Sequence, residues 1–95
     1  EGGLQDYKTA LKWYRLSAEQ GNANAQLNLG LMYAKGLGLI KDNLFAHMWF
    51  NISASNGSKD AVKNRDLAEK KMTSADISTA QKLARQCVEK KYKGC

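Results

Sequence analysis

Few residues in this sequence could carry out chemistry. Histidine occurs once, as His47, and cysteine twice, as Cys87 and Cys95, which is too few for a four-ligand zinc site of the usual kind. The Gly-Leu-Gly stretch at 36–38 lacks the lysine that follows a phosphate-binding loop. The acidic residues are scattered, so no pair is placed as general acid and general base. We therefore predict a packed or solvated His47 and a non-enzymatic chain with no metal and no cofactor.

The two cysteines lie in the last nine residues, and we predict that they form an intramolecular disulfide. Eight residues of unbroken helix would separate their Cα atoms by about 12 Å, beyond the roughly 7 Å that a disulfide can bridge. The last helix must therefore stop near Lys91, and Gly94 could let the tail fold back. A disulfide implies an oxidising compartment, so the protein would be periplasmic or secreted. The alternative is a cytoplasmic protein with two free thiols.

Composition and charge describe a folded domain with a basic end. Apolar residues reach 43%, and no run of about 18 of them exists to span a bilayer, so no membrane span is predicted. The formal net charge is +6, and residues 59–95 hold ten basic and five acidic side chains. Either a nucleic-acid-binding surface or a solvated capping helix would show this asymmetry. Since no nucleic-acid-binding motif accompanies the charge, we favour the capping helix and predict no nucleic-acid partner.

The sequence repeats itself at a spacing of 36 residues. A period of this length is typical of a helical solenoid whose units are helix pairs. Within the first 25 positions, eight identical pairs are related by the shift, where about one or two would occur by chance: Gly2 and Gly38, Asp6 and Asp42, Ala10 and Ala46, Trp13 and Trp49, Ser17 and Ser53, Ala18 and Ala54, Gly21 and Gly57, Ala25 and Ala61.

Capping residues divide the chain into five expected helices. Polar residues suited to an N-cap precede each one: Asp6, Asn22, Asp42, Ser58 and Thr73. Glycines suited to a left-handed turn follow two of them, at Gly21 and Gly57. We expect helices at about 6–19, 23–35, 42–55, 59–72 and 74–91. The fold class is then all-α, an α/α superhelix built as a right-handed solenoid of antiparallel helix pairs.

The complete unit resembles a Sel-1-like repeat, a relative of the tetratricopeptide repeat. The residues that carry the resemblance are Ala25, Leu29, Gly30, Tyr33, Gly36, Gly38, Asp42, Ala46, Trp49, Ala54 and Gly57. It implies that 1–21 is the second half of a truncated repeat, 22–57 a complete repeat and 58–95 a degenerate C-terminal capping helix pair. Gly30 inside a helix predicts close contact with a neighbouring helix. The equivalent positions of Trp13 and Trp49 predict indoles wedged between helices, rather than exposed recognition anchors.

The first helices of such a solenoid line its concave side, which these proteins use for binding. If Leu29, Gly30 and Tyr33 face the packing, helical spacing turns another set of residues to this side. The candidate partner-binding face comprises Asn24, Leu27, Leu31, Lys35, Lys63, Leu67 and Lys71. The leucines would suit an apolar peptide or helix. Alternatively, Leu27 and Leu31 complete the core against an upstream helix.

The resemblance implies a protein–protein interaction module that acts as an adaptor or scaffold and binds another protein or peptide. The alternative is an accessory repeat domain of a larger protein whose activity lies upstream of residue 1. The helix at 6–19 has no preceding partner in this sequence, so an uncovered apolar side at Leu4, Tyr7, Leu11 and Tyr14 is expected. We predict that two copies associate through this helix.

Overall fold

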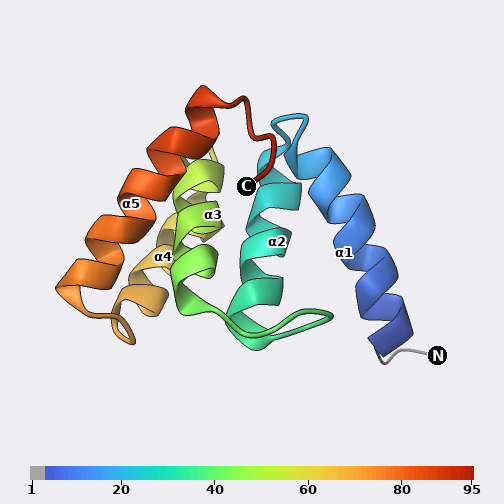
Figure 1. Cartoon of the computed structure of the whole chain (residues 1–95), viewed down its shortest axis with the longest axis horizontal. Coiled ribbons are helices and arrows are strands. Elements are labelled where there is room, and N and C mark those ends of the chain that lie inside the picture. The colour runs from blue at the N-terminus through green and yellow to red at the C-terminus, as the bar shows by residue number, and fades with distance from the viewer. Residues whose placement is uncertain (1–3) are drawn as a thin grey trace.

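The computed structural model describes the backbone of residues 4–95 and the side chains of residues 6–95. Within this part the chain forms five helices and no strand: α1 (Leu4–Ala18), α2 (Ala23–Lys35), α3 (Asn43–Ser55), α4 (Lys59–Glu69) and α5 (Ser74–Glu89). Figure 1 shows α1 and α5 at opposite sides of the molecule, with α2 and α3 between them and α4 behind α3. The predicted all-α fold of five helices is confirmed.

Local capping explains where four of the helices begin. The side chains of Asn22 and Ser58 accept hydrogen bonds from backbone N–H groups of α2 and α4. Asp42 accepts from two N–H groups of α3, and Thr73 accepts from the first turn of α5. Each bond satisfies an amide that has no partner within its own helix. The prediction for Asp6 is wrong, because α1 begins at Leu4 and Asp6 lies within its first turn.

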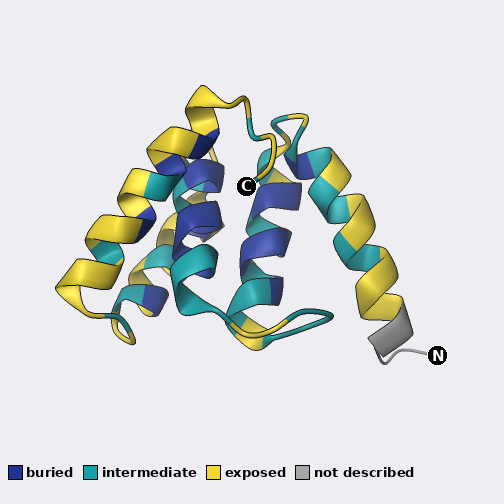
Figure 2. Ribbon diagram, viewed as in Figure 1, coloured by how far each residue is buried: buried dark blue, intermediate teal, exposed yellow. Residues whose placement is uncertain are grey.

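The core lies mainly along α2 and α3, the two central helices (Figure 2). Gly30 permits their close approach: a Cβ atom at this position would lie 2.6 Å from the ring of Phe50. The contact predicted from a glycine inside a helix is therefore confirmed. Trp49 is 1% exposed and belongs to this core, as predicted.

Trp13 corrects the prediction made for both tryptophans, because its side chain is 62% exposed. Its local sequence matches that of Trp49, but its surroundings differ. α3 packs against α2, α4 and α5, whereas α1 packs against α2. The same side chain is therefore buried in one repeat and exposed in the other.

The last two helices, α4 and α5, do not pack against each other as the helix pair of the complete repeat does. Both α4 and α5 pack against α3, and α5 makes far more contact with α3 than with α4. In Figure 1, the tail that follows α5 crosses towards α2 and the turn after α1. The contact is direct, because a Cβ atom on Gly21 would lie 3.4 Å from the ring of Tyr92.

Candidate functional site

A groove runs between α2 and α4, and Phe50 of α3 forms part of its floor. We call this groove subsite 2, because an equivalent groove, subsite 1, lies one repeat earlier in the chain. The volume of subsite 2 is about 350 Å³. It combines apolar walls with amide and ammonium groups, a composition suited to binding a peptide side chain together with its polar flanks. Its lining residues are Leu31, Ala34, Lys35, Asn43, Phe50, Asn64, Leu67, Ala68, Lys70 and Lys71.

A second groove of about 280 Å³, subsite 1, lies between α1 and α2. It is lined by Tyr7, Ala10, Tyr14, Asn28, Leu31, Met32, Lys35 and Leu37. Adding 36 to the residue number converts six of these positions into residues that line subsite 2: Asn43, Phe50, Asn64, Leu67, Ala68 and Lys71. Leu31 and Lys35 line both grooves, so the two subsites are neighbours with a shared wall.

Each subsite contains an asparagine held in the same way. The Nδ2 atom of Asn28 donates to the carbonyl oxygen of Asn24 at 3.0 Å, and that of Asn64 donates to the carbonyl oxygen of Asp60 at 2.9 Å. These bonds to the preceding helical turn fix the amide orientation. Among the described residues, neither Oδ1 atom has a hydrogen-bond partner. Each Oδ1 can therefore accept from a donor that enters its subsite.

The charge of the grooves is positive. Lys35, Lys70 and Lys71 line subsite 2, and all three side chains are exposed. No aspartate or glutamate is among the residues that line either subsite. The arrangement can therefore bind an apolar group flanked by negative charge.

The single histidine, in α3, is linked to α4 by hydrogen bonds. His47 is fully buried, and its Nε2–H donates to Glu69 at 2.8 Å. Its Nδ1 accepts from Asn51 Nδ2 at 3.0 Å, and Asn51 Oδ1 accepts from Arg65 at 3.5 Å. Both ring nitrogens are used within the protein. Of the two predicted alternatives, packed or solvated, His47 is packed, and its bonds position α4 on α3.

A larger cavity of about 730 Å³ lies between α3 and α5. Arg85 and Glu89 line it with opposite charges, beside Asn51, Ser55 and Gln81. It has no counterpart one repeat earlier, since α1 does not pack on α3 as α5 does. The two related subsites are therefore the stronger candidate for a binding surface.

The repeat that generates the two subsites matches a known family. Residues 1–22 and 23–58 match the model of the Sel1 repeat. The chain belongs to the Sel1 repeat family. It is also similar to the crystal structure of a protective antigen present in uropathogenic Escherichia coli strains and displaying an SLR fold, with 33% identity and a TM-score of 0.83. The match covers 90% of this chain and 20% of that one, so the chain spans about a fifth of that protein.

Four of the seven residues predicted for the partner-binding face line the grooves of this Sel1 repeat chain: Leu31, Lys35, Leu67 and Lys71. The other three, Asn24, Leu27 and Lys63, do not line either groove. Leu27 is partly buried against the cluster formed by Ala46, Phe50 and Ala68, so it packs on α3 and α4 rather than on an upstream helix as the core alternative expected. Leu31 packs against the same cluster and also lines both subsites.

Sequence reasoning missed the amides and aromatics of the subsites. Asn28 and Asn64 are related by the 36-residue shift, as are Tyr14 and Phe50. The match of Tyr14 to Phe50 follows from the same shift, and extending the comparison beyond the first 25 positions would have found Asn28 and Asn64. Their role depends on which helix faces contribute to one groove, and only the packing shows this.

The C-terminal tail contains the predicted Cys87–Cys95 disulfide, with a Cα–Cα distance of 5.8 Å. The helix ends at Glu89, and the chain turns through positive φ angles at Lys91 (55°), Tyr92 (68°) and Gly94 (70°). Glycine adopts such angles freely, but Lys91 and Tyr92 each pay roughly 1–2 kcal/mol for them.

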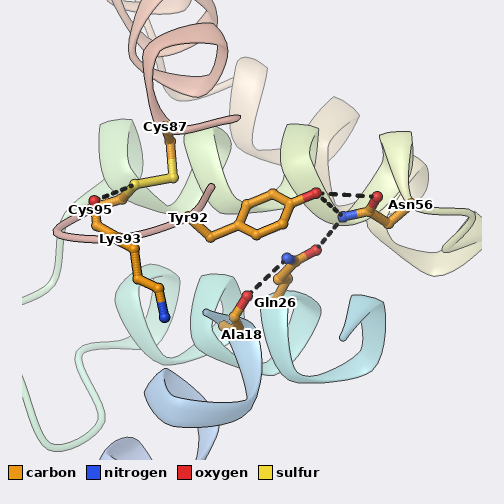
Figure 3. Close-up of a disulfide and its surroundings, with 7 residues drawn as sticks. All are labelled: Ala18, Gln26, Asn56, Cys87, Tyr92, Lys93 and Cys95. Carbon is orange, nitrogen blue, oxygen red and sulfur yellow. Dashed lines mark hydrogen bonds between the residues drawn. A yellow bond between two sulfur atoms is a disulfide. The ribbon is translucent and has the colours of Figure 1, made fainter. Parts of the chain in front are cut away.

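The tail brings Tyr92 to the ends of three other helices (Figure 3). The Tyr92 hydroxyl accepts from Asn56 Nδ2 at 3.3 Å, and the same amide donates to Gln26 Oε1 at 2.9 Å. Gln26 in turn donates through Nε2 to the carbonyl oxygen of Ala18. This polar relay joins the tail to α1, α2 and α3.

The uncovered face of α1 differs from the predicted one. Leu11 and Tyr14 are partly buried against the main core rather than uncovered. Tyr7 is partly exposed beside subsite 1, and the Leu4 side chain lies outside the described residues. α2 covers the side that was expected to be free. The uncovered apolar residues on the opposite side are Trp13 and Leu16, which are 62% and 48% exposed.

Proposed function

We propose that this Sel1 repeat protein is a non-enzymatic adaptor or scaffold whose two subsites bind a segment of another protein. Sel1 repeats mediate protein interactions, and proteins of this family are generally non-catalytic scaffolds. The recurrence of one groove in two consecutive repeats supports the assignment to this surface.

A blocking substitution on the exposed face of α4 tests the proposal. Leu67 is 56% exposed and lines subsite 2, so Leu67→Arg should fill the groove without disturbing the core. Val62→Arg is the matched control, because Val62 lies on the same helix, is also exposed and lines neither subsite. Peptides selected on the wild-type chain from a random library should lose binding to Leu67→Arg and keep it with Val62→Arg. Equal binding to both variants would refute the assignment.

A second candidate function is that of an accessory repeat domain of a larger protein, which associates through the exposed side of α1. It is supported by the exposure of Trp13 and Leu16 on one side of α1. An apolar face of this kind favours association, here of two copies through α1. Light scattering should show association that Trp13→Glu abolishes. A monomeric wild-type chain at high concentration would contradict it.

We also propose that the protein works in the periplasm or outside the cell. The disulfide supports this location, because such bonds persist in oxidising compartments. Among residues 4–95, no helix has the length and apolar character needed to cross a membrane. Intact-mass measurement of protein recovered from its native source without reductant should show two hydrogens fewer than the reduced chain. Two freely titrating thiols would place it in the cytoplasm instead.

A further inference from the structure

The chemistry of the two subsites also indicates what kind of segment binds there. Ammonium groups from Lys35, Lys70 and Lys71 surround apolar walls, and no carboxylate lines either groove. An uncharged occupant would leave these charges without a counterpart, whereas a basic occupant would be repelled. In a segment with carboxylates on either side of apolar side chains, the apolar side chains match the apolar walls and the carboxylates match the lysines.

The asparagines indicate the backbone conformation of the occupant. The Oδ1 atoms of Asn28 and Asn64 are held in place by the bonds that their Nδ2 atoms make, and each can accept from an N–H donor of the occupant. Within a helix, backbone N–H groups beyond the first turn are already bonded to carbonyl oxygens of the same helix. An extended segment keeps them free. The amides therefore favour an extended occupant over a helical one.

The spacing of the repeat sets the spacing of the side chains that enter the subsites. The two subsites lie on either side of α2, and a helix with its side chains is about 10–12 Å across, whereas an extended chain advances about 3.1–3.4 Å per residue. One repeat therefore corresponds to about three residues of an extended segment. Since subsites 1 and 2 share the wall formed by Leu31 and Lys35, one segment can enter both.

We propose that the two subsites together bind one extended, acidic segment of another protein. The segment crosses α2 and α4 and places an apolar side chain in each subsite, about three residues apart. Its backbone donates to Asn28 and Asn64, and its carboxylates face the lysines. This inference rests on the proposed binding function of the same grooves and adds the chemistry and conformation of the partner.

Labelled peptides titrated onto the oxidised, full 95-residue chain test the inference by fluorescence anisotropy. The probe carries two leucines three residues apart among glutamates. A second peptide has lysines in place of the glutamates, and a third has adjacent leucines. The probe should bind at least about tenfold more tightly than either, because the lysine peptide loses charge complementarity and adjacent leucines leave one subsite empty. Its affinity should also fall as salt is raised.

Substitutions then show whether the named groups are responsible. Asn64→Ala and Lys71→Glu should each weaken binding of the probe about five- to tenfold or more. Lys82→Glu is the matched control for charge, since Lys82 is exposed on α5 and lines neither subsite. It should leave the affinity within about twofold, with only the long-range effect of one charge.

The outcomes separate this inference from the proposed function. Neutral or basic peptides that bind as well as the probe, with loss on Leu67→Arg, would overturn the inference and leave the function standing. A bound peptide with a helical circular dichroism signal would do the same. If neither the three peptides nor any library peptide binds in a way that Leu67→Arg abolishes, both proposals fail. Binding of a single-stranded RNA, or of a second copy of the chain, at Lys71 in place of the peptides would also overturn the inference.

Discussion

Replacing Cys95 by alanine removes the Cys87–Cys95 disulfide while leaving the buried Cys87 in the core. Closing so short a loop restricts the unfolded chain by about 2.6 kcal/mol on the chain-entropy model. Release of the tail would also end the contacts of Tyr92 with Gly21 and Asn56. In the released tail, Lys91 and Tyr92 can leave their positive φ angles. This relief of backbone strain offsets part of the stability lost with the Tyr92 contacts. We expect the free energy of unfolding to fall by about 2–3 kcal/mol.

Thermal unfolding followed by far-ultraviolet circular dichroism measures this effect. For a domain of this size, the expected loss lowers the melting temperature by about 10–20 °C. Reductant should bring the wild-type chain to the same value and leave Cys95→Ala unchanged. Because Cys95 is at the end of the chain and partly exposed, the substitution itself opens no cavity in the core.

Two results would refute this reasoning. A Cys95→Ala chain within about 0.5 kcal/mol of wild type would show that the bond does not restrict the unfolded chain as the entropy model requires. A further loss of stability in Cys95→Ala on adding reductant would show that reductant acts elsewhere. Tyr92→Phe separates the relay from the bond: it keeps the disulfide and removes the hydroxyl, at a cost of about 0.5–1.5 kcal/mol.

The remaining predictions concern the core and are measured by urea denaturation. Trp49→Ala should lower the free energy of unfolding by about 3–5 kcal/mol, and Trp13→Ala by less than about 1 kcal/mol, because only the first side chain is buried; similar losses would contradict the structure. Gly30→Ala gains about 1 kcal/mol of helix propensity but overlaps the ring of Phe50, so a net loss of up to about 2 kcal/mol is expected; a more stable variant would show that the ring moves freely. His47→Ala should cost about 2–4 kcal/mol through the cavity and the two lost hydrogen bonds; a neutral effect would mean that this tie between α3 and α4 is dispensable.

Part of the candidate site could be predicted from the sequence. The 36-residue shift together with helical periodicity placed Leu31, Lys35, Leu67 and Lys71 on one side of the first helices, and all four line the grooves. Phe50 was not predicted there, because it comes from α3 and reaches the groove only where α2 and α4 leave space. A groove shared by three helices depends on their packing, and the period of one helix contains no information about it.

The sequence by itself determined the features that depend on neighbours along the chain. Four of the N-caps, the helix boundaries to within three residues, the repeat and the pairing of the two cysteines could all be predicted, since each follows from residues a few positions apart or from a strict period. Burial was decided by the tertiary structure. Trp13 and Trp49 occupy equivalent positions in similar local sequences, yet one is exposed and the other buried, because α3 packs against α2, α4 and α5 whereas α1 packs against α2. The course of α5 was decided in the same way: its apolar stripe could have faced α4 or α3, and packing on α3 places it against the core beside Trp49.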